Sequence, residues 1–286
     1  MNTNTIIENL FLVLPLLKSY HKPGSRIYDF LKQTARNEVE GLFRKNEECT
    51  KEFKPFGKLL LPYCRMGSVD SLDLFDIDEL IIFSFYWKNR NRYKNILDIG
   101  ANIGLHSIIL SKCNLKVRAY EPDPQHFEIL RKNLKLNDCV SAEIFNTAVS
   151  DKAGEAEFIR VLGNTTSSHI AGAKADPYGE LEKFIVKTEA IGSVIDWADL
   201  IKLDAEGQEK KILLSINRKQ WLQTDALVEI ESEKNAEAIY DHFAEMDVNL
   251  FSQKMNWQKV RETSDMPVSY REGTLFVSCK ETMPWE

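Results

Sequence analysis

Cysteine is scarce in this chain of 286 residues, and its spacing excludes frameworks built on cysteine. There are five cysteines, an odd number, and no two of them form a C-x-x-C pair. Disulfide scaffolds and zinc sites need paired or closely spaced cysteines. We therefore expect reduced thiols and a cytoplasmic location. The five residues are Cys49, Cys64, Cys113, Cys139 and Cys279.

An excess of basic residues and a long hydrophobic run are also missing. The chain has 37 Lys and Arg against 43 Asp and Glu, a net charge of −6. That balance disfavours binding to the phosphate backbone of nucleic acids. The apolar segment 6–17 contains Glu8 and Pro15 and is too short to cross a bilayer. We predict that it forms a helix with one face buried on the protein, not a membrane span.

What the chain does contain is typical of a globular protein, with 43% apolar and 28% charged residues. Residues 1–92 have mostly helical patterns, with helices expected over 25–43 and 76–87. We predict that this mainly helical region caps a site, binds substrate or forms an oligomer contact. A second region, 93–286, is predicted to be the cofactor-binding domain.

From residue 94 the pattern alternates between strands and helices, which predicts an α/β fold with a mostly parallel sheet covered on both faces. An insertion, 151–188, is expected to add one strand over 155–161 and a Ser- and Thr-rich loop. The predicted strands of the main sheet are 95–99, 116–121, 142–147, 199–203, 225–231 and 273–278. The predicted helices are 104–112, 124–136, 208–217 and 235–246.

The first strand leads into a Gly-containing turn, Asp98-Ile-Gly-Ala-Asn-Ile-Gly104, and the second strand ends at Glu121. This order is typical of the first βαβ unit of a nucleotide-binding sheet, with an acid placed to hold a ribose. The spacing of Gly100, Asn102 and Gly104 is not the Gly-x-Gly-x-x-Gly of a pyrophosphate site. Asp98 would repel a pyrophosphate but suits an ammonium group, such as that of S-adenosylmethionine.

A second cluster, Asp204-Ala-Glu-Gly-Gln-Glu209, follows the apolar strand 200–203. The carboxyl ends of strands face the ligand crevice in an open α/β sheet, so Asp204 and Glu206 are expected near the reacting groups. These carboxylates could act as a base, hold a substrate hydroxyl or bind a divalent metal, although no metal site is predicted. Helix capping together with turn formation is an equally good explanation of Glu209. His169, in the insertion loop, is a further candidate base.

Four segments together resemble the successive motifs of the FkbM-type methyltransferase family. They cover residues 95–217 in the family's order: 98–104, 121–124, 148–154 and 201–209. The resemblance implies a class I methyltransferase (Rossmann-like) fold. It further implies that S-adenosylmethionine donates a methyl group, usually to a hydroxyl of a sugar, glycan or natural product.

The resemblance also implies roles for individual residues. The methionyl part of the cofactor would be surrounded by Asp98, Gly100, Asn102 and Gly104. Glu121 would bind the ribose, Asp123 would lie beside the ribose or adenine, and Val149 would pack on the adenine. For catalysis, Asp204 or His169 would be the base and Glu206 would orient the acceptor hydroxyl.

Two other functions remain open at this point. A nicotinamide-dependent oxidoreductase shares the βαβ unit, but the glycine spacing and Asp98 disfavour it. A non-catalytic binding module on the same fold is the second alternative. The sequence does not identify the acceptor, the base, the dependence on metal or the oligomeric state, and a homo-oligomer is compatible with it.

Overall fold

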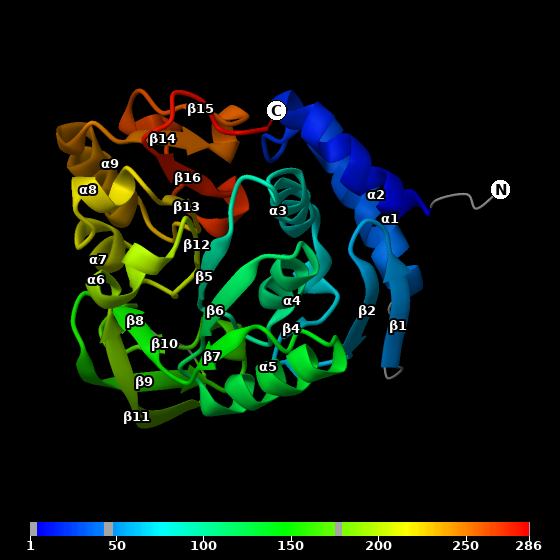
Figure 1. Cartoon of the computed structure of the whole chain (residues 1–286), viewed down its shortest axis with the longest axis horizontal. Helices are drawn as coiled ribbons and strands as arrows, with labels where there is room; N and C mark the ends of the chain where they lie inside the picture. The colour runs from blue at the N-terminus through cyan, green and yellow to red at the C-terminus, as the bar shows by residue number, and fades with distance from the viewer. Residues whose placement is uncertain (1–4, 43–47, 175–178, 286) are drawn as a thin grey trace.

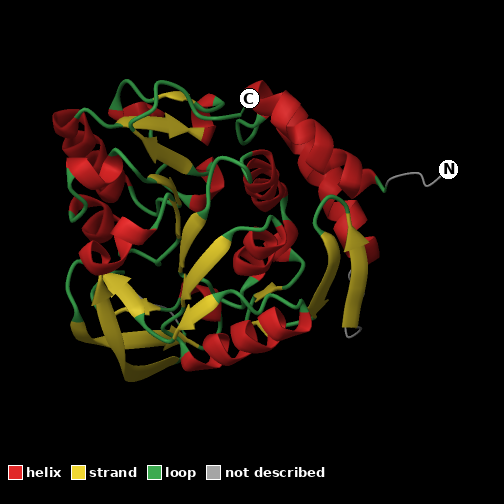
Figure 2. Cartoon of the chain, in the orientation of Figure 1, coloured by secondary structure: helices red, strands yellow, loops and turns green. Residues whose placement is uncertain are grey.

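The computed structural model describes residues 5–42, 48–174 and 179–285. Its centre is a sheet of eight strands with helices on both faces (Figures 1 and 2). The strands lie side by side in the order β7–β6–β5–β12–β13–β16–β14–β15. Their bounds are Glu143–Phe145 (β7), Lys116–Tyr120 (β6), Asn95–Ile99 (β5), Leu200–Leu203 (β12), Asp225–Val228 (β13), Leu275–Ser278 (β16), Asn249–Ser252 (β14) and Gln258–Lys259 (β15).

The order of the strands reverses between β5 and β12. The neighbours from β7 to β13 are parallel, and β16 runs antiparallel between β13 and β14. The chain begins this sheet at β5, adds β6 and β7 on one side, and then returns to place β12 on the other side. An open α/β sheet forms its ligand crevice at such a switch point.

Both faces of the sheet are buried against helices. One hydrophobic core joins the sheet to α3 (Ile77–Lys88), α4 (Leu105–Lys112) and α5 (Pro124–Leu136). A second core, on the opposite face, includes side chains of α6 (Ile191–Val194), α7 (Glu209–Leu214), α8 (Arg218–Trp221) and α9 (Glu233–Met246). Burial on both faces explains why the central strands are nearly continuous apolar runs.

The predicted α/β architecture, with a mostly parallel sheet covered on both faces, is therefore confirmed, and most predicted elements agree with it. The predicted strands 95–99, 116–121 and 199–203 correspond to β5, β6 and β12, and the helices expected at 104–112 and 124–136 correspond to α4 and α5. The sequence did not predict the edge strands β14 and β15. Both are short, and β15 has only exposed side chains, so neither carries a strong apolar pattern.

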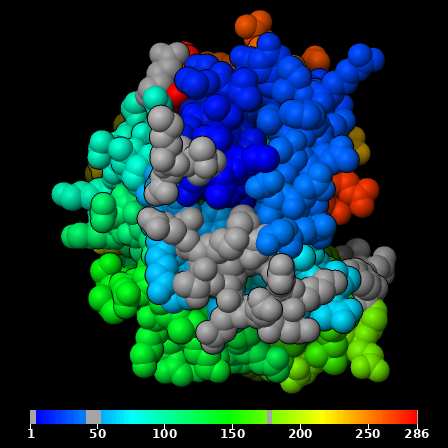
Figure 3. All heavy atoms as spheres, turned by 90° about the vertical axis from the view of Figure 1, so that its right-hand side faces the viewer, coloured from blue at the N-terminus to red at the C-terminus, as the bar shows by residue number. Residues whose placement is uncertain are grey.

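The N-terminal region is mainly helical but also contains paired strands that the sequence did not predict. Its helices α1 and α2 (blue) cover the upper part of the face shown in Figure 3. Phe43, expected at the end of α2, lies outside the described residues. The elements are α1 (Ile6–Val13), η1 (Leu14–Tyr20), α2 (Arg26–Leu42), β1 (Glu48–Phe53), β2 (Gly57–Pro62), β3 (Arg65–Met66), β4 (Val69–Asp70) and η2 (Asp73–Phe75).

The segment 6–17 packs one face on the protein, as predicted. Ile7, Leu10, Phe11 and Leu14 are buried, whereas Leu16 is exposed. In the part of the chain that the structure describes, no helix is both long and apolar enough to cross a membrane. Four of the five cysteines are described and are free thiols; the side chain of Cys49 lies outside the described residues.

The insertion after the third strand forms a separate small sheet below the main one (Figure 1). Its predicted strand 155–161 corresponds to β9 (Gly154–Val161). It pairs with β11 (Leu181–Ala190), which the sequence did not predict, and with β10 (His169–Ile170). The fourth strand is β8 (Ala148–Ser150), parallel to the end of β11, so this sheet extends from the region next to β7.

Candidate active site

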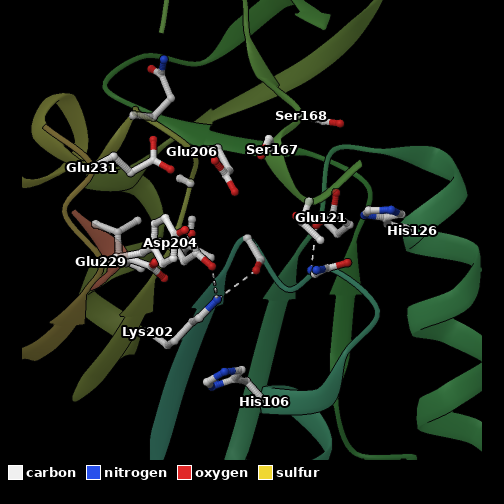
Figure 4. Close-up of a pocket in the computed structure, with 18 of the residues that line it drawn as sticks. His106, Glu121, His126, Ser167, Ser168, Lys202, Asp204, Glu206, Glu229 and Glu231 are labelled. Carbon is white, nitrogen blue, oxygen red and sulfur yellow. Dashed lines mark hydrogen bonds and ion pairs between the residues drawn. The ribbon is translucent and has the colours of Figure 1, made fainter. Parts of the chain in front are cut away.

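A cavity of about 730 Å³ lies at the carboxyl ends of β5, β12 and β13. Its walls include the turn after β5, the loop after β12 and the insertion (Figure 4). The N-terminal region and the loop before β16 line it as well. The cavity therefore occupies the switch point of the sheet, as expected for a ligand site in this fold.

The turn after β5 needs glycine for two different reasons. Gly100 has a φ of +78°, and a Cβ there would lie 1.7 Å from the carbonyl oxygen of Asp204. Gly104 has a φ of +91°, and its Cβ would meet Leu130 at 2.4 Å. The first glycine thus lets β5 and β12 approach each other, and the second lets α4 pack on α5. Gly100 lines the cavity, but Gly104 does not.

Glu121 is held at the end of β6 by two backbone groups. Its Oε2 accepts a hydrogen bond from the Asn102 amide and its Oε1 accepts one from the Asp123 amide, each 2.8 Å long. Burial raises the pKa of Glu121 to about 8, although these two amides oppose that shift. The carboxylate lines the cavity beside the glycine turn, where the sequence predicted an acid for a ribose.

Asp98 lies behind the wall of the cavity and does not line it. The side chain is fully buried, and its Oδ2 accepts a hydrogen bond of 2.5 Å from the Ser107 hydroxyl in α4. Its Oδ1 has no hydrogen-bond partner but lies 4.0 Å from the Lys202 ammonium. The predicted contact of Asp98 with a methionyl amine stays a prediction; in this structure the side chain contacts the underside of the turn.

Two further predicted cofactor residues line the cavity, and one of them also has a structural partner. Val149 is buried at the end of β8 and lines the wall. Asp123 is the N-cap of α5 and forms an ion pair with the buried Arg160 of β9. Arg160 Nε and Nη2 donate hydrogen bonds to Asp123 Oδ2 and Oδ1, each 2.6 Å long. That pair ties the insertion to the main sheet, so Asp123 has a structural function whatever else it contacts.

The loop after β12 brings acidic side chains to the centre of the cavity. Asp204 is half-buried and its Oδ2 lies 3.3 Å from the Lys202 ammonium. Glu206 has a φ of +50° and forms an ion pair with Lys174, which also contacts Glu231 at 3.1 Å. Burial and the nearby carboxylates of Asp204 and Glu231 raise the pKa of Glu206.

Of the capping and turn formation that the sequence offered as an alternative for Glu209, the structure shows turn formation; the N-cap of α7 is Gln208, and it makes no side-chain capping hydrogen bond. The Glu209 carboxylate accepts hydrogen bonds from the amides of Ala205 and Gly207 at 2.8 and 2.9 Å. It is almost fully buried and does not line the cavity. This residue shapes the turn that carries Asp204 and Glu206.

His169, a predicted base, does not line the cavity either. It is buried in β10, with Nδ1 2.9 Å from the Ser167 carbonyl and Nε2 without a hydrogen-bond partner. Its neighbours Ser168 and Ile170 do line the cavity. Residues alternate along a strand, so His169 points to the other side.

Several cavity residues were not predicted as site residues from the sequence. Glu229 and Glu231 follow β13, and the strand-end rule that found Asp204 would have found them as well. His126 contacts Thr165 at 2.9 Å, which closes the insertion loop on α5. His106 lies between Glu79 and Tyr86. Its Nε2 is 2.8 Å from Glu79 Oε2, and its Nδ1 is 3.0 Å from the Tyr86 hydroxyl. The contact with Glu79 joins the N-terminal region to α4.

Within the described ranges, no three His, Cys, Asp or Glu side chains are grouped so as to hold a metal ion. The acidic residues around the cavity are instead joined to lysines and backbone amides. The sequence names no metal ligands, and this stays a prediction.

Comparisons with known proteins show what this chain resembles. A model of the methyltransferase FkbM domain matches residues 98–256. Methyltransferase sdnD from Sordaria araneosa is 26% identical over 159 residues, which covers 44% of this chain and 61% of the relative. The chain thus spans about three fifths of the length of that curated relative.

Solved structures give weaker similarities. A precorrin-6y C5,15-methyltransferase from Geobacter metallireducens has a TM-score of 0.36 at 12% identity, covering 67% of this chain and 82% of the other. The bifunctional kinase-methyltransferase WbdD has a TM-score of 0.37 at 14% identity, covering 69% and 38%. Scores this low carry no information about the substrate.

Proposed function

Because a model of the methyltransferase FkbM domain matches more than half of the chain, the protein belongs to that family of S-adenosylmethionine-dependent methyltransferases, and we propose that it methylates a hydroxyl group. The acceptor we propose is a sugar, glycan or natural product of similar polarity. The observation that supports this most directly is the cavity at the switch point of the sheet. It is lined by Glu121, which we assign to the ribose, and by Asp204, which we assign to the reacting hydroxyl.

The residues present fit the cofactor. Glu121 presents a carboxylate that two ribose hydroxyls can donate to, and Gly100 and Asn102 offer a turn that a ligand can approach closely. Val149 supplies an apolar surface for the adenine. S-adenosylmethionine, when bound, supplies an electrophilic methyl group on a positively charged sulfur.

The protein's part in methyl transfer is mainly to align the acceptor and to receive its proton. Alignment of reacting atoms removes much of the entropic cost of the reaction. We propose that Asp204 takes the proton from the acceptor hydroxyl at its free Oδ1, while Lys202 holds its Oδ2. Glu206 would orient the hydroxyl. His169, which points away from the cavity, is the weaker candidate for the base.

The test of the function is methyl transfer itself. The protein is incubated with S-adenosylmethionine labelled in its methyl group and with a panel of hydroxylated sugars and natural-product alcohols. We expect the label in an ether of one acceptor class. A non-catalytic module would bind the cofactor and give no labelled product with any acceptor of the panel.

The role of Asp204 is tested separately with Asp204→Asn. We expect binding of S-adenosylhomocysteine within about twofold of the wild type, and a loss of turnover of about 10²–10⁴, which is the usual contribution of a positioned base. Asp247→Asn is the matched control, because Asp247 is exposed and far from the cavity. Full activity of Asp204→Asn on its acceptor would show that the base lies elsewhere.

The charges around the cavity favour a neutral or cationic acceptor. Among the described lining residues there is no arginine, and both lysines already contact carboxylates. Arginine is the side chain best suited to bind phosphate, and the lining contains more acidic than basic side chains. We expect a sugar to be methylated more efficiently than its phosphate ester, measured as the ratio of kcat/KM. A preference for the phosphorylated sugar would contradict this assignment.

A further inference from the structure

Lys202 is a charged residue in an otherwise apolar central strand. Its neighbours in β12 are Leu200, Ile201 and Leu203, all buried. Its side chain is only 11% exposed and emerges on the cavity wall below Asp204 (Figure 4). A largely buried lysine in a central strand costs stability unless its ammonium is paired. The groups that pair with the ammonium therefore indicate the function of the residue.

All three partners of the ammonium belong to the candidate site. It donates a hydrogen bond of 3.1 Å to the carbonyl of Gly100 and one of 3.3 Å to Asp204 Oδ2. The third partner, Asp98 Oδ1, lies at 4.0 Å. Lys202 is in register with Asp98 across the β5–β12 ladder, so the two side chains leave the sheet on the same face.

The surrounding charges keep the ammonium protonated. Burial alone would lower the pKa of Lys202, but the carboxylates of Asp204, Asp98, Glu79 and Glu229 raise it instead. Glu79 belongs to the N-terminal region and Glu229 follows β13, so negative side chains face the ammonium from three elements besides its own strand. The lysine is a cation beside the close contact between Gly100 and the backbone of Asp204.

We propose that Lys202 is a positioning residue of the methyl transfer, whose ammonium ties the Gly100 carbonyl of the cofactor turn to the Asp204 carboxylate. The proposal rests on the function argued above. Each of its two hydrogen bonds has a separate consequence. The bond to Gly100 fixes the turn that binds the cofactor, and the bond to Asp204 leaves only Oδ1 of the carboxylate for the acceptor proton.

The first measurement is the dissociation constant of S-adenosylhomocysteine for the full-length protein, by calorimetry. Lys202→Met keeps an unbranched side chain that is one atom shorter and removes both hydrogen bonds. Loss of a hydrogen bond to a charged group is expected to weaken binding about ten- to a hundredfold. Lys202→Arg retains the cation and should recover most of the affinity. Lys183→Met, at an exposed lysine outside the cavity, should bind like the wild type.

The second measurement separates positioning from a general loss of stability. At saturating S-adenosylmethionine, Lys202→Met should lower turnover in the wild-type background but not further in the Asp204→Asn background. In the double variant the weakened binding of S-adenosylhomocysteine should persist. A structural defect would instead lower turnover in both backgrounds by the same factor.

The proposed function and the role of Lys202 are overturned by different results. A wild-type protein that does not bind S-adenosylhomocysteine would overturn the proposed function. A Lys202→Met protein that binds as tightly as the wild type would overturn only the role of Lys202. If Lys202→Met does not fold, Lys202→Gln is measured in the same way, and wild-type affinity in that variant equally overturns the proposal.

Discussion

At the scale of single residues, Glu121 shows how the backbone prepares a side chain for a ligand. Both carboxylate oxygens accept a backbone amide, one from the glycine turn and one from the start of α5. The side chain is therefore fixed before any ligand binds, so little rotamer entropy remains to be lost on binding. Burial, however, favours the protonated form of the acid.

This conflict predicts a pH dependence of cofactor binding. Because burial raises the pKa of Glu121 to about 8, the acid is mostly protonated at neutral pH in the free protein. Two ribose hydroxyls donate to the ionised form, so the affinity for S-adenosylhomocysteine should rise with pH and level off above about 8. Calorimetric titrations at a series of pH values measure this. Glu121→Gln should bind more weakly and without that rise.

Glu121 also makes the stability of the free protein depend on pH. The pKa of Glu121 is higher in the folded protein than the ordinary value of 4.5. Its contribution to stability is therefore fully present below about pH 4.5 and is lost as the pH rises through about 8. A wild-type affinity for S-adenosylhomocysteine that does not change with pH would contradict the assignment of Glu121 to the ribose.

The sequence reveals some residues of the site more readily than others. Glu121 and Asp204 could be predicted because each follows an apolar strand, and the ends of parallel strands meet at one edge. The partners of Lys202 and Asp98 could not be predicted in the same way. Their partners depend on the register of β5 against β12, which is a property of the folded sheet.

At the scale of elements, Gly100 joins two strands. A Cβ on this residue would lie 1.7 Å from the carbonyl oxygen of Asp204, which follows β12. The absence of a Cβ therefore leaves room for that carbonyl. The contact between the cofactor turn and the acidic loop therefore depends on one glycine. Motif spacing predicted a close approach of backbone to a ligand here, which stays a prediction. The structure shows a close approach of backbone to backbone at this position.

Gly100→Ala should destabilise the protein strongly. The new Cβ would force β5 and β12 apart and would hold alanine at a φ of +78°. We expect a loss of about 3 kcal/mol or more, from the strained backbone together with overpacking. Urea unfolding measures it. Gly192→Ala, at a glycine in α6 with no atom within 4 Å and no positive φ, is the control and should be nearly neutral.

A small effect of Gly100→Ala would mean that the two loops can separate at little cost. The acidic loop after β12 would then be mobile relative to the cofactor turn. In that case the hydrogen bonds of Lys202 would also be weak, so this variant checks the geometry on which the role of Lys202 depends.

One of the strands that the sequence patterns missed has a partner far away along the chain. β11 pairs with β9 across the whole insertion loop, and much of it is exposed and charged. Without an apolar run, only its partner identifies it as a strand. The helices α4 and α5, by contrast, follow their strands directly. α5 carries a periodic apolar face and α4 is a short, mostly buried apolar segment after the glycine turn, so their positions were predicted closely.

At the scale of the whole molecule, the N-terminal region and the sheet share one hydrophobic core. Phe85 of α3 packs on Phe276 of β16 with ring centroids 5.7 Å apart, and on Trp285 at 5.3 Å. The Asn89 amide donates a hydrogen bond to the Pro284 carbonyl at 2.8 Å. The same region lines the cavity through Asp73, Leu74 and Glu79. It therefore supports the fold and the proposed acceptor site together.

Removal of residues 1–92 should consequently abolish folding. Each large apolar side chain of α3 contributes about 1.5–3 kcal/mol by its burial. The buried set in that helix includes Ile77, Leu80, Ile81, Phe83 and Phe85. Their combined contribution is comparable with the whole stability of a typical domain, about 5–15 kcal/mol. We expect the fragment 93–286 to show no cooperative thermal transition by circular dichroism and no binding of S-adenosylhomocysteine.

A fragment that begins at Asp73 keeps α3 and separates its contribution from that of the elements before it. We expect this fragment to bind S-adenosylhomocysteine, because α3 covers the face of the sheet below Lys202 and contacts α4 through Glu79 and His106. Cooperative folding of the fragment 93–286 with wild-type affinity would instead show that the first 92 residues are an independent cap. The division of the chain at residue 92 would then be a boundary in folding as well as in sequence.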